Sequence, residues 1–263
     1  GIEVKWFELE GPATTEALAA KSIDIATSLN YVSAIIAKAN GNDIKIISSY
    51  SKFPKAIGIV AGVDSGVFSV ADLKGKKVAL QKGTMLQEMV IRALEQENLT
   101  AGDIEIVGMP SPDAINALLQ QQVDAAVLPD PLMTKAIASK KAKLIRNAEG
   151  LILGQAVIAA RTDFLQKYPD VAERFLEIHS QTLTWAENNC EEALDMTSKT
   201  IEMDIKAVKA LYPKFDFKMN LDENNQAQFL DTAEFLKSNG FIKSEVKTDS
   251  LIKDLIDTRF LKK

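Results

Sequence analysis

The chain has 263 residues, of which 46% are hydrophobic and 25% charged, which suits one large domain or two lobes with a substantial core. Its net charge of -5 argues against a nucleic-acid partner, because such partners usually require a basic surface. A single cysteine excludes an intramolecular disulfide, and a single histidine beside it leaves the common zinc sites out of reach. No run of about 18 apolar residues predicts a membrane-spanning helix.

Short apolar runs alternate with helical patterns along most of the chain. These runs predict strands at 2–9, 23–27, 44–49, 56–61, 77–81, 104–107, 124–128, 143–146 and 156–160. Helices are predicted at 13–21, 31–39, 85–97, 112–121 and 132–139, with a single turn at 70–73. From residue 163 the pattern is almost entirely helical, at 163–168, 169–188, 191–200, 204–211, 222–238 and 248–257. The alternation predicts an α/β fold with mostly parallel sheets covered by helices and a helical C-terminal part.

Two of the predicted strands end in a sharp turn that opens directly into a helix. One turn lies in VALQKGT at 78–84 and the other in AAVLPDP at 125–131. The first backbone N–H groups of a helix lack partners within it, and the helix dipole adds a positive potential there. Two such turns in one α/β fold predict a cleft for an anion or polar ligand and favour binding over catalysis. The common phosphate, dinucleotide, nucleophile and zinc motifs are absent, so no cofactor and no metal are expected.

Several segments resemble a known family in their order and spacing. They read GIEV at 1–4, EALAAKSIDIA at 16–26, VADLKGKKVA at 70–79, QKGT at 81–84, VDAA at 123–126 and LPDP at 128–131. Together they make the chain similar to the type II periplasmic substrate-binding proteins of ABC importers. The branch they resemble is the nitrate, sulfonate, taurine and thiamine-precursor group.

This resemblance implies two α/β lobes that are joined by two crossovers and hold a ligand between them. Lobe one would comprise 1–70 and 156–263, and lobe two 75–150. The hinge would lie near 64–72 and 150–155. The family normally has one more strand and helix before the segment that begins this sequence, so that unit is expected to be missing here.

The function that the resemblance implies is that of an extracytoplasmic solute-binding protein without catalytic activity. It would act in the periplasm or on the outer face of the membrane, with or without a lipid anchor in its precursor. Its partners would be a small polar or anionic ligand, such as a sulfonate, nitrate, taurine or a pyrimidine, and an ABC permease. The protein itself would be a monomer. Two alternatives stay open: an enzyme of the menaquinone-pathway or thiamine-pyrimidine type on the same fold, and a sensory ligand-binding domain.

Polar residues at two strand ends of lobe one are candidates for ligand binding. Ser28, Asn30 and Tyr31 follow one strand, and ligands of open α/β sheets lie at the carboxyl ends of strands. Asn30 also suits a helix N-cap, and the two roles are compatible. Ser49 and Tyr50 end another strand, where both can donate hydrogen bonds and Tyr50 can stack on a ligand. The alternative for this pair is an ordinary polar turn.

In lobe two the candidates are the turns themselves. Gly83 permits close approach of the backbone, Thr84 offers a hydroxyl and Met85 a flexible apolar wall. The alternative for Thr84 is simple helix capping. Asp130 can accept a hydrogen bond from a ligand or act as a helix-capping acid. Gln155, at the return crossover, completes the candidate set.

Three further residues are assigned structural roles. His179 lies within a predicted helix, and Cys190 is a lone thiol. Arg161 is expected to form an ion pair rather than to bind an anion. Backbone N–H groups would therefore have to bind most of an anionic ligand.

Overall fold

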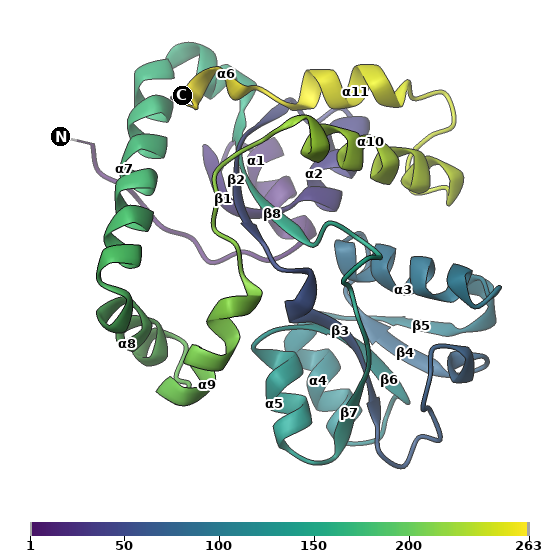
Figure 1. Cartoon of the computed structure of the whole chain (residues 1–263). Helices are drawn as coiled ribbons and strands as arrows, with labels where there is room; N and C mark the ends of the chain where they lie inside the picture. Colours follow the sequence, from purple (N-terminus) through teal and green to yellow (C-terminus); the bar gives the residue numbers. More distant parts are fainter. Residues whose placement is uncertain (1, 262–263) are drawn as a thin grey trace.

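The computed structural model describes residues 2–261, which form two β-sheets flanked by helices (Figure 1). One sheet has the strand order β1-β8-β2, and we call it and its helices lobe A; the other has the order β5-β4-β6-β3-β7, and we call it and its helices lobe B. The strands are β1 (Ile25–Asn30), β2 (Ile44–Lys52), β3 (Ile57–Gly62), β4 (Lys77–Leu80), β5 (Glu105–Gly108), β6 (Ala125–Pro129), β7 (Ala142–Asn147) and β8 (Gln155–Arg161).

The helices cover both sheets and form most of the C-terminal part, as predicted. Those in the first part are α1 (Pro12–Ala19), α2 (Tyr31–Ala39), α3 (Met85–Gln96), α4 (Ser111–Leu119) and α5 (Leu132–Ala138). The later ones are α6 (Thr162–Lys167), α7 (Pro169–Asn188), α8 (Cys190–Thr200), α9 (Ile205–Leu211), α10 (Glu223–Ser238) and α11 (Thr248–Leu255). Short 3-10 turns lie at Pro54–Ala56, Ala71–Leu73, Ala101–Asp103, Tyr212–Lys214 and Thr258–Phe260. Within residues 2–261, no helix is both long and apolar enough to cross a membrane.

In each sheet, every strand but one runs in the same direction. β8 is antiparallel to β1 and β2, and β3 is antiparallel to β6 and β7. β4 is parallel to both β5 and β6. Because the reversed strand lies inside its sheet, many neighbouring pairs are antiparallel although most strands share one direction. The α/β class is confirmed, and each expected parallel sheet contains one reversed strand.

The chain crosses between the sheets twice, and the two crossings lie side by side. The first is the turn Pro54–Ala56, and the second is the segment 148–154. The Phe53 N–H donates to the Gly154 carbonyl at 2.7 Å, which links the two. Gly154 has a φ of +57°, and a Cβ there would lie 2.8 Å from the Cα of Pro54. Glycine at this position therefore lets the two crossings touch.

The place of β3 differs from the expected lobe boundary. Residues 57–62 pair with β6 and β7 in lobe B, whereas the expected lobe one comprises 1–70 and the expected hinge lies near 64–72. The strand is almost completely buried, and such a run fits the interior of either sheet. The apolar pattern of residues 57–62 indicates a buried strand, but it does not indicate which of the two sheets contains that strand. The first crossing therefore precedes β3.

The strand predicted at 2–9 is wrong. Residues 2–10 pair with no strand of the described chain, and their apolar side chains are largely exposed, as at Trp6. A strand needs a partner for its N–H and C=O groups, and alternation in sequence does not supply one. The segment instead leads across the molecule into α1 (Figure 1).

The largest hydrophobic core joins the two lobes. Tyr31 and Ile35 of α2, Met89 of α3 and Phe229 of α10 are buried in one cluster. The rings of Tyr31 and Phe229 stack with centroids 5.5 Å apart. Figure 1 shows α3 lying next to α10 and α2, so this side of the molecule holds the sheets together.

Candidate ligand-binding site

A large cleft of about 1720 Å³ lies between the two sheets and the helices α7–α9. Its walls come from the ends of β1 and β2, the starts of α3, α4 and α5, and the segment 212–220. Figure 1 shows α7, α8 and α9 arching along one side of both sheets. The cleft therefore has surfaces from both lobes and from the helical C-terminal part. Within the described residues, no cluster of three or more acidic, histidine or cysteine side chains is placed to hold a metal ion.

Some of the predicted site residues line this cleft and others do not. The residues that line it are Ser28, Asn30, Tyr50, Thr84, Met85 and Asp130. The residues that do not line it are Tyr31, Ser49 and Gln155, which are buried, and Gly83, which is partly exposed. In this structure the second group makes its contacts inside the protein, and binding of a ligand by these four residues stays a prediction.

Asn30 and Thr84 cap helices, and Asn30 also joins the two lobes. The Asn30 Oδ1 accepts hydrogen bonds from the Val32 N–H at 3.0 Å and from the Met85 N–H at 3.3 Å. The Thr84 Oγ1 accepts from the Leu86 N–H at 3.2 Å and donates to the Gln81 carbonyl at 2.7 Å. The capping alternative for both residues is therefore present. A contact with a ligand remains a prediction for each.

Ser49 and Gln155 form part of a buried amide network instead of the cleft surface. The Gln155 Nε2 donates to the Ser49 Oγ at 2.7 Å, and the Asn225 Nδ2 donates to the Gln155 Oε1 at 2.9 Å. The register of β2 against β8 shifts between Ser49 and Ser51. At this irregularity Tyr50 reaches the cleft, whereas Ser49 stays bonded inside the protein.

Tyr31 and Gly83 bond to elements behind the cleft. The Tyr31 hydroxyl donates to the Glu88 Oε2 at 2.5 Å inside the core. The Gly83 carbonyl accepts from the Ser33 hydroxyl at 2.9 Å, and its N–H donates to the Gln87 Oε1 at 2.9 Å. The turn at Gly83 is thus bonded to α2 and α3, which positions the start of α3.

Asp130 is fully engaged by the protein. Its Oδ1 accepts from the N–H and hydroxyl of Thr134 at 2.9 and 2.6 Å, and its Oδ2 accepts from the Lys214 Nζ at 2.6 Å. Its side chain has 0% exposure. Of the two predicted roles, the helix-capping acid is therefore the one that its contacts support. The bond to Lys214 also ties the segment before Phe215 to the end of β6.

An aromatic wall, which the sequence analysis did not assemble, forms one side of the cleft. It consists of the rings of Tyr50, Phe53, His179, Tyr212, Phe215 and Phe217. Tyr50 stacks on His179 at 5.5 Å, and Phe217 lies edge-on to Tyr50 at 6.5 Å. Burial raises the pKa of Tyr50 and lowers that of His179, so both are neutral at pH 7. His179 and Cys190, expected to be structural, both line the cleft.

The signal for this wall was the spacing of its phenylalanines. Phe215 and Phe217 are two residues apart in a connecting segment that is not helical. The backbone of Asp216 between them exchanges hydrogen bonds with Lys52 at 2.7 and 2.8 Å, which holds the segment extended. In an extended segment, residues two apart point to the same side. Both rings therefore face the same way, beside Phe53.

The charged residues of the cleft lining are mostly acidic. They are Glu10, Asp130, Glu187, Asp216 and Lys218. The Lys218 Nζ lies 3.7 Å from the Asp216 Oδ2, so its charge has a partner. Arg161 lies outside the lining and pairs with Asp24 at 2.5 Å and Asp163 at 3.0 Å, which confirms its ion-pair role. Because Lys218 is the single cation among these lining residues, an anion in this cleft would take most of its hydrogen bonds from neutral donors.

Neutral donors are available where helices begin. Ser28 and Ser51 lie near the ends of β1 and β2, and Ser111 opens α4; all three line the cleft. The starts of α3 and α4 are also part of the lining. The positive ends of their dipoles and the nearby hydroxyls suit an anion whose charge is spread over several oxygens.

Comparison with known proteins gives a consistent result. A family model described as "NMT1/THI5 like" matches residues 1–193. A protein of Bacillus subtilis (strain 168) named "Putative aliphatic sulfonates-binding protein" is 31% identical, over 100% of this chain and 79% of that protein. The periplasmic aliphatic sulphonate binding protein SsuA from Escherichia coli has a similar crystal structure, with a TM-score of 0.79 and 25% identity, covering 94% of this chain and 79% of that one.

Two further solved structures share the fold alone. The alkanesulfonate-binding protein SsuA from Xanthomonas axonopodis pv. citri, bound to MOPS, has a TM-score of 0.86 at 22% identity, covering 94% of this chain and 84% of that one. The desulfurization enzyme DSZB has a TM-score of 0.62 at 15% identity, covering 90% of this chain and 84% of that one. The periplasmic-binding-protein fold is thereby confirmed, and it is shared with an enzyme. The family match over most of the chain and the relative at 31% identity show that this chain belongs to the NMT1/THI5-like family.

Proposed function

We propose that this chain is the sulfonate-binding component of an ABC importer. It would act outside the cytoplasm and deliver its ligand to a membrane permease. Among the ligands that the sequence analysis left open, a sulfonate agrees with the names of the relatives, whereas nitrate and pyrimidines have no such support.

The observation that carries this proposal is the meeting of two helix starts from different lobes. The Met85 N–H, which begins α3 of lobe B, donates to the side chain of Asn30, which caps α2 of lobe A. A sulfonate seated beside this junction would contact both lobes at once. Such a ligand stabilises the closed arrangement because it binds that state better than an open one.

The small number of cations in the described lining agrees with a sulfonate headgroup. A sulfonate spreads one charge over three oxygens, each of which accepts hydrogen bonds. The hydroxyl groups of Ser28 and Ser111 are donors of this neutral kind, and the dipole of α3 adds a positive potential beside them. Lys218, the cation in the lining of the described chain, faces Asp216.

The test is isothermal titration calorimetry of the purified chain with hexanesulfonate and, as a matched ligand, hexanoate. We expect the sulfonate to bind at least tenfold more tightly. Ser28→Ala should weaken sulfonate binding by about tenfold, the cost of a hydrogen bond to a charged group. Ser244→Ala, at an exposed serine outside the cleft, is the control and should leave binding unchanged. Equal affinity for both ligands, or binding of neither, would contradict the proposal.

The alternative is an enzyme on the same fold, which the likeness to a desulfurization enzyme keeps open. His179 and Cys190, the single histidine and cysteine of the chain, both line the cleft. Mass spectrometry of the ligand after prolonged incubation separates the two functions. Recovery of unchanged sulfonate supports a binding protein, and loss of the sulfonate group supports an enzyme.

A further inference from the structure

We infer that the cleft selects a sulfonate with an aromatic tail over a saturated sulfonate of the same shape. This inference rests on the proposed function, because it names the organic part of the same ligand. The wall that would contact this tail consists of Tyr50, Phe53, His179, Tyr212, Phe215 and Phe217.

The wall is a continuous run of rings rather than a scatter of apolar side chains. Phe53 lies 5.4 Å from Phe215, which stacks on Phe217 at 5.9 Å with an interplanar angle of 11°. Phe217 also stacks on Tyr212 at 6.2 Å and meets Tyr50 edge-on at 6.5 Å. These distances fall within the range of attractive aromatic pairs. An aromatic ring of a ligand that enters the cleft could therefore pack against this run of rings as one more member.

The wall is also held in place before any ligand binds. The two backbone hydrogen bonds between Lys52 and Asp216 fix Phe53 and Phe215 beside each other. On the same segment, Lys214 is bound to the buried carboxylate of Asp130. A binding surface that is already ordered loses little conformational entropy when the ligand arrives. The rings therefore suit a rigid flat tail.

The stacking argues for an aromatic tail rather than a cationic one. A cation binds over an open ring face. Phe217 is stacked with both Phe215 and Tyr212, so its ring is already engaged by other rings. Stacked rings present positively polarised edges to their surroundings, and such edges attract the face of another ring. They attract neither an ammonium group nor a saturated ring in the same way.

The size of the cleft fits this tail. Its volume of about 1720 Å³ exceeds the roughly 300–1,000 Å³ that is typical of small-ligand pockets. A headgroup at the helix starts leaves room for one or more rings beside the wall. Residues 129–132 of lobe B line the same cleft, far in sequence from the segments that carry the wall.

The experiment compares benzenesulfonate with cyclohexanesulfonate by calorimetry on the full chain. The two ligands have the same headgroup and number of carbons, and they differ in aromaticity. We expect benzenesulfonate to bind about twofold to twelvefold more tightly, the range expected for one aromatic pair. Phe217→Leu keeps apolar bulk but removes the ring, so it should abolish this preference while cyclohexanesulfonate still binds. Phe68→Leu, at an exposed ring outside the cleft, is the matched control and should keep the preference.

Each outcome separates this inference from the proposed function. Equal binding of the two ligands overturns the aromatic preference and leaves sulfonate binding intact. A preference that survives Phe217→Leu in a folded variant overturns the role of the wall. Tighter binding of 3-(trimethylammonio)propanesulfonate than of benzenesulfonate also overturns the inference, since it indicates a cationic tail. If no sulfonate binds, the proposed function itself fails.

Discussion

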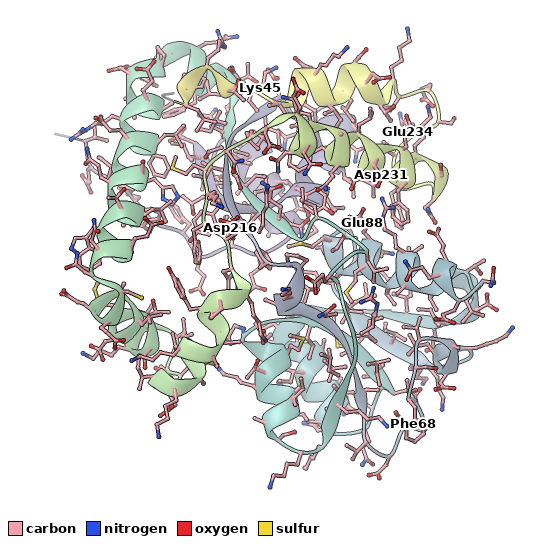
Figure 2. All side chains as sticks on the ribbon, viewed as in Figure 1. Lys45, Phe68, Glu88, Asp216, Asp231 and Glu234 are labelled. Carbon is pink, nitrogen blue, oxygen red and sulfur yellow. The ribbon has the colours of Figure 1, made fainter. Side chains whose placement is uncertain are left out.

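The Tyr31 hydroxyl donates a 2.5 Å hydrogen bond to the Glu88 Oε2, and the two residues belong to helices from different lobes. The Thr232 hydroxyl of α10 donates to the Glu88 Oε1 at 2.8 Å, and the Arg92 Nε lies 3.0 Å from the same oxygen. Arg92 in turn pairs with Asp231 (Figure 2 labels Glu88 and Asp231). With its side chain 1% exposed, Glu88 is a buried carboxylate that joins α2, α3 and α10.

Tyr31→Phe is expected to lower the free energy of unfolding by about 1–3 kcal/mol. The substitution keeps the ring that stacks on Phe229 but removes a donor to a buried carboxylate, which is costly to leave unpaired. Urea denaturation followed by circular dichroism measures the effect. Tyr168→Phe, at an exposed tyrosine, is the control and should change stability by less than about 0.5 kcal/mol. A similar small change for Tyr31→Phe would contradict the role of the hydrogen bond.

Glu88 should make stability depend on pH. Burial raises its pKa, although the bonds from Tyr31, Arg92 and Thr232 oppose that rise. Between the unfolded pKa of about 4.3 and the higher folded value, the folded protein binds more protons than the unfolded chain. The contribution of Glu88 to stability is therefore complete below about pH 4 and falls as the pH rises through this window.

Glu88→Gln removes this titration. We expect the stability of the wild type relative to the variant to decrease as the pH rises from about 4, measured by urea unfolding at several pH values. Glu95→Gln, at an exposed position on the same helix, is the matched control. A constant difference between wild type and Glu88→Gln across pH 4–7 would show that burial does not shift this group.

The contributions of Lys214 and Asp130 to the free energy of unfolding should depend on each other. Lys214→Met leaves the buried carboxylate without its cation, so it should lower stability by about 1–3 kcal/mol. In an Asp130→Asn background the same substitution should cost less, because the charge has gone. The double-mutant cycle measured by urea unfolding gives the coupling. Additive effects would mean that the two residues do not depend on each other.

Thr84→Val tests the cap at the start of α3. It removes the acceptor of the Leu86 N–H, and we expect a loss of about 1 kcal/mol in unfolding free energy. Thr200→Val, near an exposed helix end, is the comparison for the loss of a hydroxyl. Sulfonate affinity is measured on the same samples. If affinity stays unchanged while stability falls, Thr84 has a capping role and no direct contact with the ligand.

Helices were predictable where their signals lie in neighbouring residues. The helix expected at 169–188 is α7, Pro169–Asn188, since proline at its first position and apolar periodicity mark it locally. The strand expected at 2–9 failed because it depended on a distant partner. The site residues were likewise predictable from neighbouring residues only in part. Strand ends indicated where polar residues gather, but the side on which Ser49 and Tyr50 lie depends on how β2 is packed.

By itself, the sequence determined the α/β class, the family and most helices, because periodicity, capping residues and turns act between near neighbours. Only the tertiary structure decided that β3 lies in lobe B, because an apolar run predicts a buried strand without indicating which sheet contains it. It also decided that Tyr50, His179 and Phe217 share one wall. These rings come from segments far apart in the chain, and such contacts form only when folding offsets the entropy of closing long loops.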